Sequence, residues 1–232
     1  MEIYIGIDLA WGDKNLSGFA VLCFSEGELK LLDIKLLHSL DAVIQEIEKY
    51  DLHNVYIGVD APLLIPNESG NREIEKNFNR DFSKYKIAML PVNRKLLSKY
   101  SQNIRSEELY LHLSKLGYKR DFASKKTIFE VYPHSTIAVC FNEYKILPYK
   151  RKKGRNSEFL CEQLEIYKSY LNSVISNHSL FQTDTSILKG ASMKDFEDKL
   201  DAVVSAYTLY FCKYNAHIFY TLDGIPTFIT PK

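Results

Sequence analysis

The chain has 232 residues, of which 46% are hydrophobic and 25% are charged, and its formal net charge at pH 7 is +1. These values are ordinary for a globular protein, and a chain of this length buries a core that needs no disulfide or metal staple. A net charge near zero excludes a strongly basic histone-like protein and a long acidic tail. It leaves open a local basic patch that binds nucleic acid.

The cysteine and hydropathy patterns predict the compartment. The four cysteines are far apart and form no C-x-x-C pair, which argues against a zinc site and a thioredoxin-type motif. Unclustered thiols fit a reducing compartment. No basic-then-apolar signal segment opens the chain, and no uncharged apolar run reaches transmembrane length. We therefore expect a soluble, cytoplasmic protein with no membrane partner.

The N-terminal part of the chain predicts three hairpin-linked strands, a helix, and a strand that returns beside the first. Apolar residues at helical spacing predict the helix over 39–50, with Ser39 as its N-cap. This order of elements is typical of a mixed β-sheet. Apolar, β-branched runs predict the strands over 3–9, 17–24, 28–37 and 54–60.

Residues from about 62 to 127 are polar and irregular by comparison, with a predicted helix over 106–117. We expect this segment to be an insertion or lid over a site, or a helical subdomain. No linker interrupts the chain, so residues 1–232 are expected to form one domain. The later elements are a strand over 127–132 closed by Pro133, a basic stretch over 145–155, helices over 157–176 and 194–213, and a hairpin of 216–220 and 225–229.

One pattern occurs twice. Tyr-Ile-Gly-Ile-Asp at 4–8 is echoed by Tyr-Ile-Gly-Val-Asp at 56–60, so two predicted strands each end in a carboxylate, Asp8 and Asp60. Asp is disfavoured inside strands and costly to bury unpaired. If these strands are neighbours, the two carboxylates repel each other, and a metal cation would neutralise them. The alternative is that each Asp only opens a turn.

The last predicted helix adds two further acids. Asp198 and Asp201 are three residues apart and share a helix face, and no charged residue follows between 202 and 212. Asp201 therefore lies where the helix enters the core. The alternative is that the helix dipole favours acidic residues in the first turn, which explains Asp198 well and Asp201 less well.

Together these pieces resemble the RNase H-like superfamily, and the final helix resembles that of RuvC-type resolvases. More closely, the chain resembles domain-of-unknown-function family 429, described as predicted RNase H-like nucleases. The resemblance implies an α/β fold with a mixed five-stranded sheet flanked by helices and a mostly helical insertion. The matching pieces are GIDLAWG (6–12), GVDAPL (58–63), the stretch around Arg80 and Asp81, FEVYPH (129–134), DKLDAVVSAYT (198–208) and GIPTFITP (224–231).

The resemblance implies a metal-dependent nuclease. Two Mg²⁺ or Mn²⁺ ions about 3.5–4 Å apart would activate water and stabilise the leaving oxygen of a phosphodiester, and both ions prefer carboxylate ligands. Asp8 would bridge the metals, Asp60 would bind one, and Asp201, helped by Asp198, would bind the other. Glu130, in an otherwise apolar strand, is the remaining catalytic candidate. Its alternative is a solvent-facing strand position.

Nucleic acid is the expected partner. A basic run with Tyr144 and Tyr149 before it is a candidate backbone-binding loop with stacking aromatics, or else a solvated, mobile loop. His134 is a weaker candidate for proton transfer or phosphate contact, with a capping or loop histidine as the alternative, and Trp11 is a weaker candidate for a pocket wall. Arg72, Arg80 and Arg94 are phosphate candidates whose default interpretation is a solvated surface. The residues of the basic run are Lys150, Arg151, Lys152, Lys153 and Arg155.

Two other classes of function compete with a nuclease. A sugar-kinase or actin-like phosphotransferase shares the core fold, but the chain has no Gly-rich phosphate loop of the G-x-G-x-x-G or G-x-x-x-x-G-K-[ST] type. A catalytically silent module that binds nucleic acid or protein is the other alternative, because a fold alone does not determine function.

Overall fold

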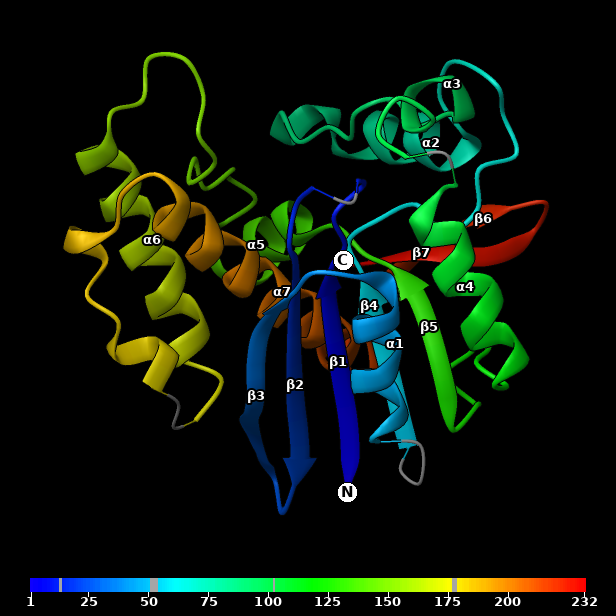
Figure 1. The fold of residues 1–232 in the computed structure, drawn as a ribbon, viewed down its shortest axis with the longest axis horizontal. Coiled ribbons are helices and arrows are strands. Elements are labelled where there is room, and N and C mark those ends of the chain that lie inside the picture. Colours follow the sequence, from blue (N-terminus) through cyan, green and yellow to red (C-terminus); the bar gives the residue numbers. More distant parts are fainter. Residues whose placement is uncertain (13, 51–53, 102, 177–178) are drawn as a thin grey trace.

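The computed structural model describes residues 1–12, 14–50, 54–101, 103–176 and 179–232. Within these residues the chain forms a seven-stranded mixed sheet in the order β3-β2-β1-β4-β5-β7-β6 (Figure 1). The strands are β1 (Glu2–Asp8), β2 (Ser17–Ser25), β3 (Glu28–Leu37), β4 (Asn54–Val59), β5 (Lys126–Glu130), β6 (His217–Leu222) and β7 (Ile225–Pro231).

The predicted order of the first strands is confirmed. β1, β2 and β3 form an antiparallel meander, β4 returns parallel to β1, and β5 is parallel to β4. The expected number of five strands is wrong, because the C-terminal hairpin extends the same sheet. Its strand β7 pairs with β5 through Phe228 and Glu130. Phe228 and Ile229 are fully buried, so the hairpin covers an apolar strand edge that β5 would otherwise expose.

Helices cover both faces of the sheet (Figure 1). Helices α1 and α4 pack on one face against Ile3, Ile5 and Ile7, and α7 packs on the other face with α5 and α6 beside it. The helices are α1 (Leu40–Glu48), α2 (Glu73–Phe82), α3 (Arg94–Leu97), α4 (Arg105–Lys115), α5 (Pro133–Phe141), α6 (Ser157–Asn172) and α7 (Ala191–Tyr214). No helix among the described residues is long and apolar enough to cross a membrane.

Two glycines let α7 lie directly on the sheet. Gly6 in β1 and Gly58 in β4 are the third residues of the two echoed pentapeptides. A Cβ at Gly6 would overlap the carbonyl oxygen of Ala202, and a Cβ at Gly58 would overlap that of Ser205. The close approach that glycine permits brings the acidic first half of α7 next to the ends of β1 and β4.

The insertion lies beyond the C-terminal ends of β1, β4 and β5, where α2 and α3 are seen above the sheet in Figure 1. The helix predicted at 106–117 is α4, at Arg105–Lys115. Helix α5 has no counterpart among the predicted elements, because a proline directly after an apolar run also fits a strand end. Proline at the first helical position is instead favourable, since its fixed φ suits a helix start and its missing N–H needs no partner there.

Candidate functional site

Asp8 and Asp60 lie level with each other at the ends of neighbouring parallel strands. The register of β1 and β4 places Ile7 opposite Val59, and the backbone N–H of Asp60 donates to the carbonyl oxygen of Ile7 at 2.8 Å. Side chains alternate along a strand, so both carboxylates point to the face on which α7 packs. The sequence prediction of two adjacent strand-end acids is confirmed.

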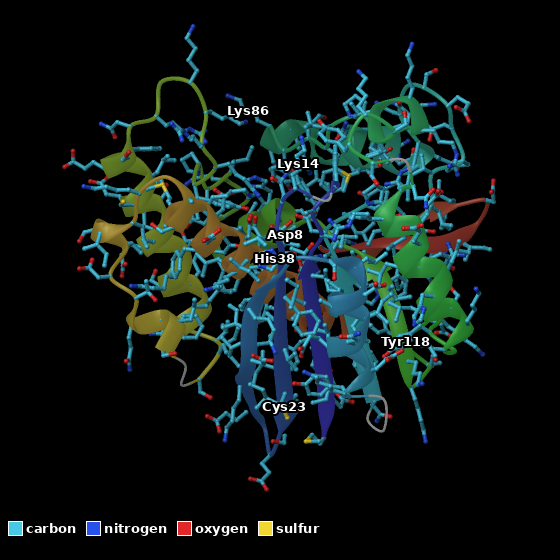
Figure 2. The ribbon with its side chains drawn as sticks, in the orientation of Figure 1. Asp8, Lys14, Cys23, His38, Lys86 and Tyr118 are labelled. Carbon is cyan, nitrogen blue, oxygen red and sulfur yellow. The ribbon has the colours of Figure 1, made fainter. Side chains whose placement is uncertain are left out.

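Both carboxylates line a cavity of about 660 Å³ between the sheet edge and the insertion. Figure 2 shows Asp8 at this end of β1, with Lys86 of the insertion above it. The cavity has the size of a pocket for a small molecule or for part of a larger one. Trp11 lines it, as the sequence predicted. The lining residues used below are Arg72, Glu75, Lys86, Met89, Val92, Glu130, Tyr132, His134, Ile146, Lys150, Lys152 and Arg155.

The pKa values of both acids are displaced upward. Desolvation raises the pKa of Asp60 to about 7, and the negative charge of Asp201 adds to the shift. Desolvation and then Asp201 also raise the pKa of Asp8 well above its ordinary value. Neither side-chain carboxylate has a hydrogen-bond donor among the described residues. Two half-buried carboxylates facing one cavity therefore lack a direct counter-charge.

Asp201 is close to these acids but is enclosed. It is fully buried, and both of its carboxylate oxygens are occupied. Its Oδ1 accepts hydrogen bonds from the hydroxyls of Tyr149 at 2.7 Å and Tyr167 at 2.9 Å, and its Oδ2 accepts one from Lys150 Nζ at 2.6 Å. Burial opposes ionisation, but Lys150 and the hydroxyl of Tyr149 lower the pKa of Asp201 below its ordinary value. Asp201 is therefore a fully satisfied carboxylate.

Two lysines supply the positive charge around α7. Lys150 also lies 3.3 Å from the carboxylate of Glu197, and Lys194 forms an ion pair with Asp198. Burial works against the charged form of Lys150, but Asp201 and then Asp8 raise its pKa well above the ordinary value. Lys150 was expected on a backbone-binding loop; its ammonium instead contacts the acids.

Glu130 does not join the other acids. Its carboxylate accepts from Arg72 Nη1 and Nη2, both at 2.8 Å, and from the backbone N–H of Leu63 at 2.7 Å. Arg72 also binds Glu75, and all three charged side chains are buried. The partner of Glu130 is therefore an arginine. Both the solvent-facing alternative for Glu130 and the solvated surface expected for Arg72 are wrong.

The rest of the basic run divides into two groups. Lys152 and Arg155 line the cavity, whereas Arg151 and Lys153 are exposed and do not. Arg155 Nη1 donates to the carbonyl oxygen of Lys150 at 2.6 Å and so holds the start of the loop. Lys86 also lines the cavity, but no sequence pattern marked it as a site residue. It reaches the cavity only because the insertion folds over the ends of the strands.

His134 lies at the cavity wall in the first turn of α5 and not in a loop. Its ring packs against Tyr149 and Tyr132, with centroids 4.9 and 5.4 Å away. Its Nδ1 is buried and has no hydrogen-bond partner among the described residues. Burial lowers the pKa of His134 to about 4, so the ring is neutral at physiological pH. Arg80 and Arg94 instead pair with Asp81 and Glu107 outside the cavity lining.

The donor chemistry of Asp8 and Asp60 suits a hard divalent cation, because both carboxylates face the cavity and have no hydrogen-bond or ion-pair partner in the part of the chain that the structure describes. Among the described residues, however, no three His, Cys, Asp or Glu side chains are placed to hold one ion together. Asp201 is turned to Lys150, and Asp198 to Lys194. Asp8 and Asp60 therefore fit a metal ion that completes its shell with water, whereas Asp201 and Asp198 are already paired.

Fold and site together define a mixed α/β protein with a carboxylate-lined cavity at the C-terminal edge of its parallel strands. The chain belongs to the family described as protein of unknown function, DUF429, whose model matches residues 6–216. This match confirms the family that the sequence motifs resembled. No curated protein matches the chain.

Proposed function

We propose that this protein is an RNase H-like nuclease that hydrolyses phosphodiester bonds of nucleic acid with Mg²⁺ or Mn²⁺. The observation that carries the proposal is the pair of unpartnered carboxylates, Asp8 and Asp60, on one face of two adjacent parallel strands. The antiparallel meander of β1, β2 and β3 with β4 returning beside β1 supports the RNase H-like assignment, because it is one of the pieces on which the resemblance rests. Bound at Asp8 and Asp60, the ion would supply Lewis-acid stabilisation of the phosphate and the leaving oxygen.

The residues around the two acids suit a nucleotide. Lys86, Lys152 and Arg155 line the cavity and would bind phosphate oxygens through charge-assisted hydrogen bonds. Apolar side chains, among them Met89 and Ile146, line the same cavity and would pack against a base or sugar. Lys86 lies on the insertion, so phosphates would be bound from above as well as from the basic run.

The wall that the insertion contributes is held in place by hydrogen bonds. The side chain of Asn79 accepts from the backbone N–H of Met89 at 2.7 Å and donates to its carbonyl oxygen at 3.0 Å. Tyr132 donates to Ala88 O at 3.2 Å, and Asn67 donates to Val92 O at 2.9 Å. A fixed wall over a cavity of about 660 Å³ favours a single strand as substrate, because a single strand can bend its backbone into such a cavity more easily than a duplex can.

The competing functions make different predictions. A phosphotransferase would need a backbone phosphate cradle, and the chain has no Gly-rich loop of the common types. A silent binding module would bind nucleic acid without turnover. The deciding experiment measures cleavage of single-stranded DNA and RNA by purified protein with EDTA, Mg²⁺ or Mn²⁺.

The variant for this test is Asp8→Asn, and the matched control is Asp41→Asn, which changes an exposed aspartate on α1. The proposal predicts metal-dependent cleavage by the wild type and by Asp41→Asn, and none by Asp8→Asn. Equal product from the wild type and Asp8→Asn would mean that the activity comes from a contaminant. Binding without cleavage would favour the silent module.

A further inference from the structure

We propose that the site binds one divalent ion, on Asp8 and Asp60, and that the ammonium of Lys150 is the second positive charge, fixed at Asp201. This inference rests on the proposed function and differs from the two-metal arrangement that the resemblance implies. It assigns Lys150 to the reaction centre and Asp201 to holding that lysine in place.

The first argument is the occupancy of Asp201. Its Oδ2 is 2.6 Å from Lys150 Nζ, and its Oδ1 already accepts two tyrosine hydroxyls, at 2.7 and 2.9 Å. A second ion at Asp201 would have to displace the ammonium or break the tyrosine hydrogen bonds inside a fully buried cluster. Hydrogen bonds to a buried carboxylate are among the strongest in proteins, and their loss leaves the hydroxyls unpaired as well.

The second argument is the fixed backbone of Lys150. Tyr149, the preceding residue, is 1% exposed and packs in the main core cluster. The carbonyl oxygen of Lys150 accepts from Arg155 Nη1 at 2.6 Å. The backbone on both sides of Lys150 is therefore held, so the ammonium leaves Asp201 only by rotation of its own side chain, which breaks the ion pair with a fully buried carboxylate.

The third argument is the balance of charge. Lys150 pairs with Asp201, Lys194 pairs with Asp198, and the carboxylate of Glu197 lies 3.3 and 3.4 Å from the two lysines. Among the described residues around this site, Asp8 and Asp60 are the carboxylates with no direct cationic partner, and one divalent ion matches their combined charge. A second divalent ion would bring surplus positive charge next to Lys150, which like-charge repulsion disfavours.

The position of Lys150 also suits a part in the chemistry. Lys150 lines the same cavity as Asp8 and Asp60. Its ammonium can therefore approach a phosphate group bound there and offset negative charge that develops on the oxygens in the transition state. Asp201 faces no substrate, since it is fully buried, and would act as a positioning residue for the lysine.

Calorimetric titration of metal-free protein with Mn²⁺ tests the inference. We expect one Mn²⁺ per chain for the wild type, two for Lys150→Met, which frees Asp201, and one again for Lys150→Met combined with Asp201→Asn. Lys150→Arg keeps the positive charge and should bind one. Two ions in the wild type, or still one in a folded Lys150→Met, would overturn the inference.

A second measurement needs no variant. Wild-type protein with two equivalents of Mn²⁺ should give the electron paramagnetic resonance spectrum of an isolated bound ion plus free Mn²⁺, and a spin-coupled pair would refute the inference. A spin-coupled pair together with metal-dependent cleavage would leave the proposed nuclease function intact. Protein that binds no Mn²⁺ at Asp8 and Asp60 and cleaves no substrate would refute both proposals.

Discussion

The carboxylate of Glu130 points to the opposite face of the sheet from that of Asp60, although the two residues end neighbouring parallel strands. In the register of β4 and β5, Glu130 lies beside Val59, one residue before Asp60. Side chains alternate along a strand, so this offset of one residue sends the two acids to opposite faces. Both residues line the cavity, but the carboxylate of Glu130 is bound to Arg72 and ties the insertion to the sheet, whereas that of Asp60 has no such ion pair among the described residues.

This relationship predicts that Glu130→Gln acts on stability and not on metal binding. The change removes one partner of a buried ion pair, and breaking such a pair costs about 3–5 kcal/mol when no other partner remains. Since Glu75 still pairs with Arg72, we expect the lower part of that range or less. Urea unfolding and Mn²⁺ titration should show a lower free energy of unfolding with an unchanged Mn²⁺ affinity. A large loss of Mn²⁺ affinity without destabilisation would return Glu130 to the metal site.

Asp60→Asn is expected to stabilise the metal-free protein above neutral pH. The pKa of Asp60 is about 7 in the folded state and near 3.8 when unperturbed, so the folded protein retains the proton over this interval. The wild type should therefore lose stability as the pH rises from about 4 to 7, by about 1–3 kcal/mol. Unfolding should be measured in EDTA at several pH values. The two proteins should have similar free energies of unfolding near pH 4, and the variant should have the higher free energy of unfolding at pH 8.

Mn²⁺ should reverse this order, because the ion binds the folded wild type and stabilises it by mass action. The melting temperature of the wild type should rise with added Mn²⁺, and that of Asp60→Asn should rise less. If Asp60→Asn melts lower than the wild type in EDTA and both gain equally from Mn²⁺, the two strand-end acids are structural.

His134 should make the free energy of unfolding depend on pH with a sign opposite to that of Asp60. Its folded-state pKa is about 4, below the 6.5 of an unperturbed histidine. The unfolded chain therefore takes up the proton first, and stability is lost as the pH falls from about 6.5 to 4. His134→Phe keeps the ring contacts and removes the unpartnered Nδ1. Its unfolding free energy should fall less over this interval than that of the wild type; an identical slope would contradict the assignment.

Preference for a single strand is a prediction of the fixed insertion wall. We expect the wild type to cleave a single-stranded oligonucleotide several-fold faster than the same sequence in a duplex. Asn79→Ala removes both hydrogen bonds to the backbone of Met89 and should narrow this difference. Equal rates on both substrates for the wild type would show that the wall does not limit access.

The echoed pentapeptides predict the two neighbouring strands and the acids at their ends, which is most of the site that the sequence could predict. In each one a tyrosine, a glycine and an aspartate occupy alternate positions, so a strand assignment alone places all three on one face. That the glycines lie under α7 is a finding of the structure, because the strand period does not say which helix covers that face. The period could not predict the face of Glu130 either, because that depends on the register between β4 and β5, which the residues of β5 alone do not specify.

Contacts between residues far apart in the sequence could not be predicted either. Lys150 and Asp201 are 51 residues apart. From the sequence alone, a lysine in a basic run cannot be told from a solvated surface charge, and only the fold places Lys150 next to α7. The C-terminal hairpin was predicted, but its pairing with β5 rests on Glu130 and Phe228, which are far apart in the chain. The one local signal that was overlooked is Arg72 with Glu75, which together form the capping box of α2.

The central claim, a divalent ion held by Asp8 and Asp60, is tested most directly by anomalous diffraction from crystals soaked in Mn²⁺. The account predicts one anomalous peak in the cavity, about 2.1 Å from an oxygen of each of the two carboxylates. Lys150 should remain on Asp201. The absence of a peak beside Asp8 and Asp60, or an ion held by Asp201 and Asp198 without them, would contradict the account.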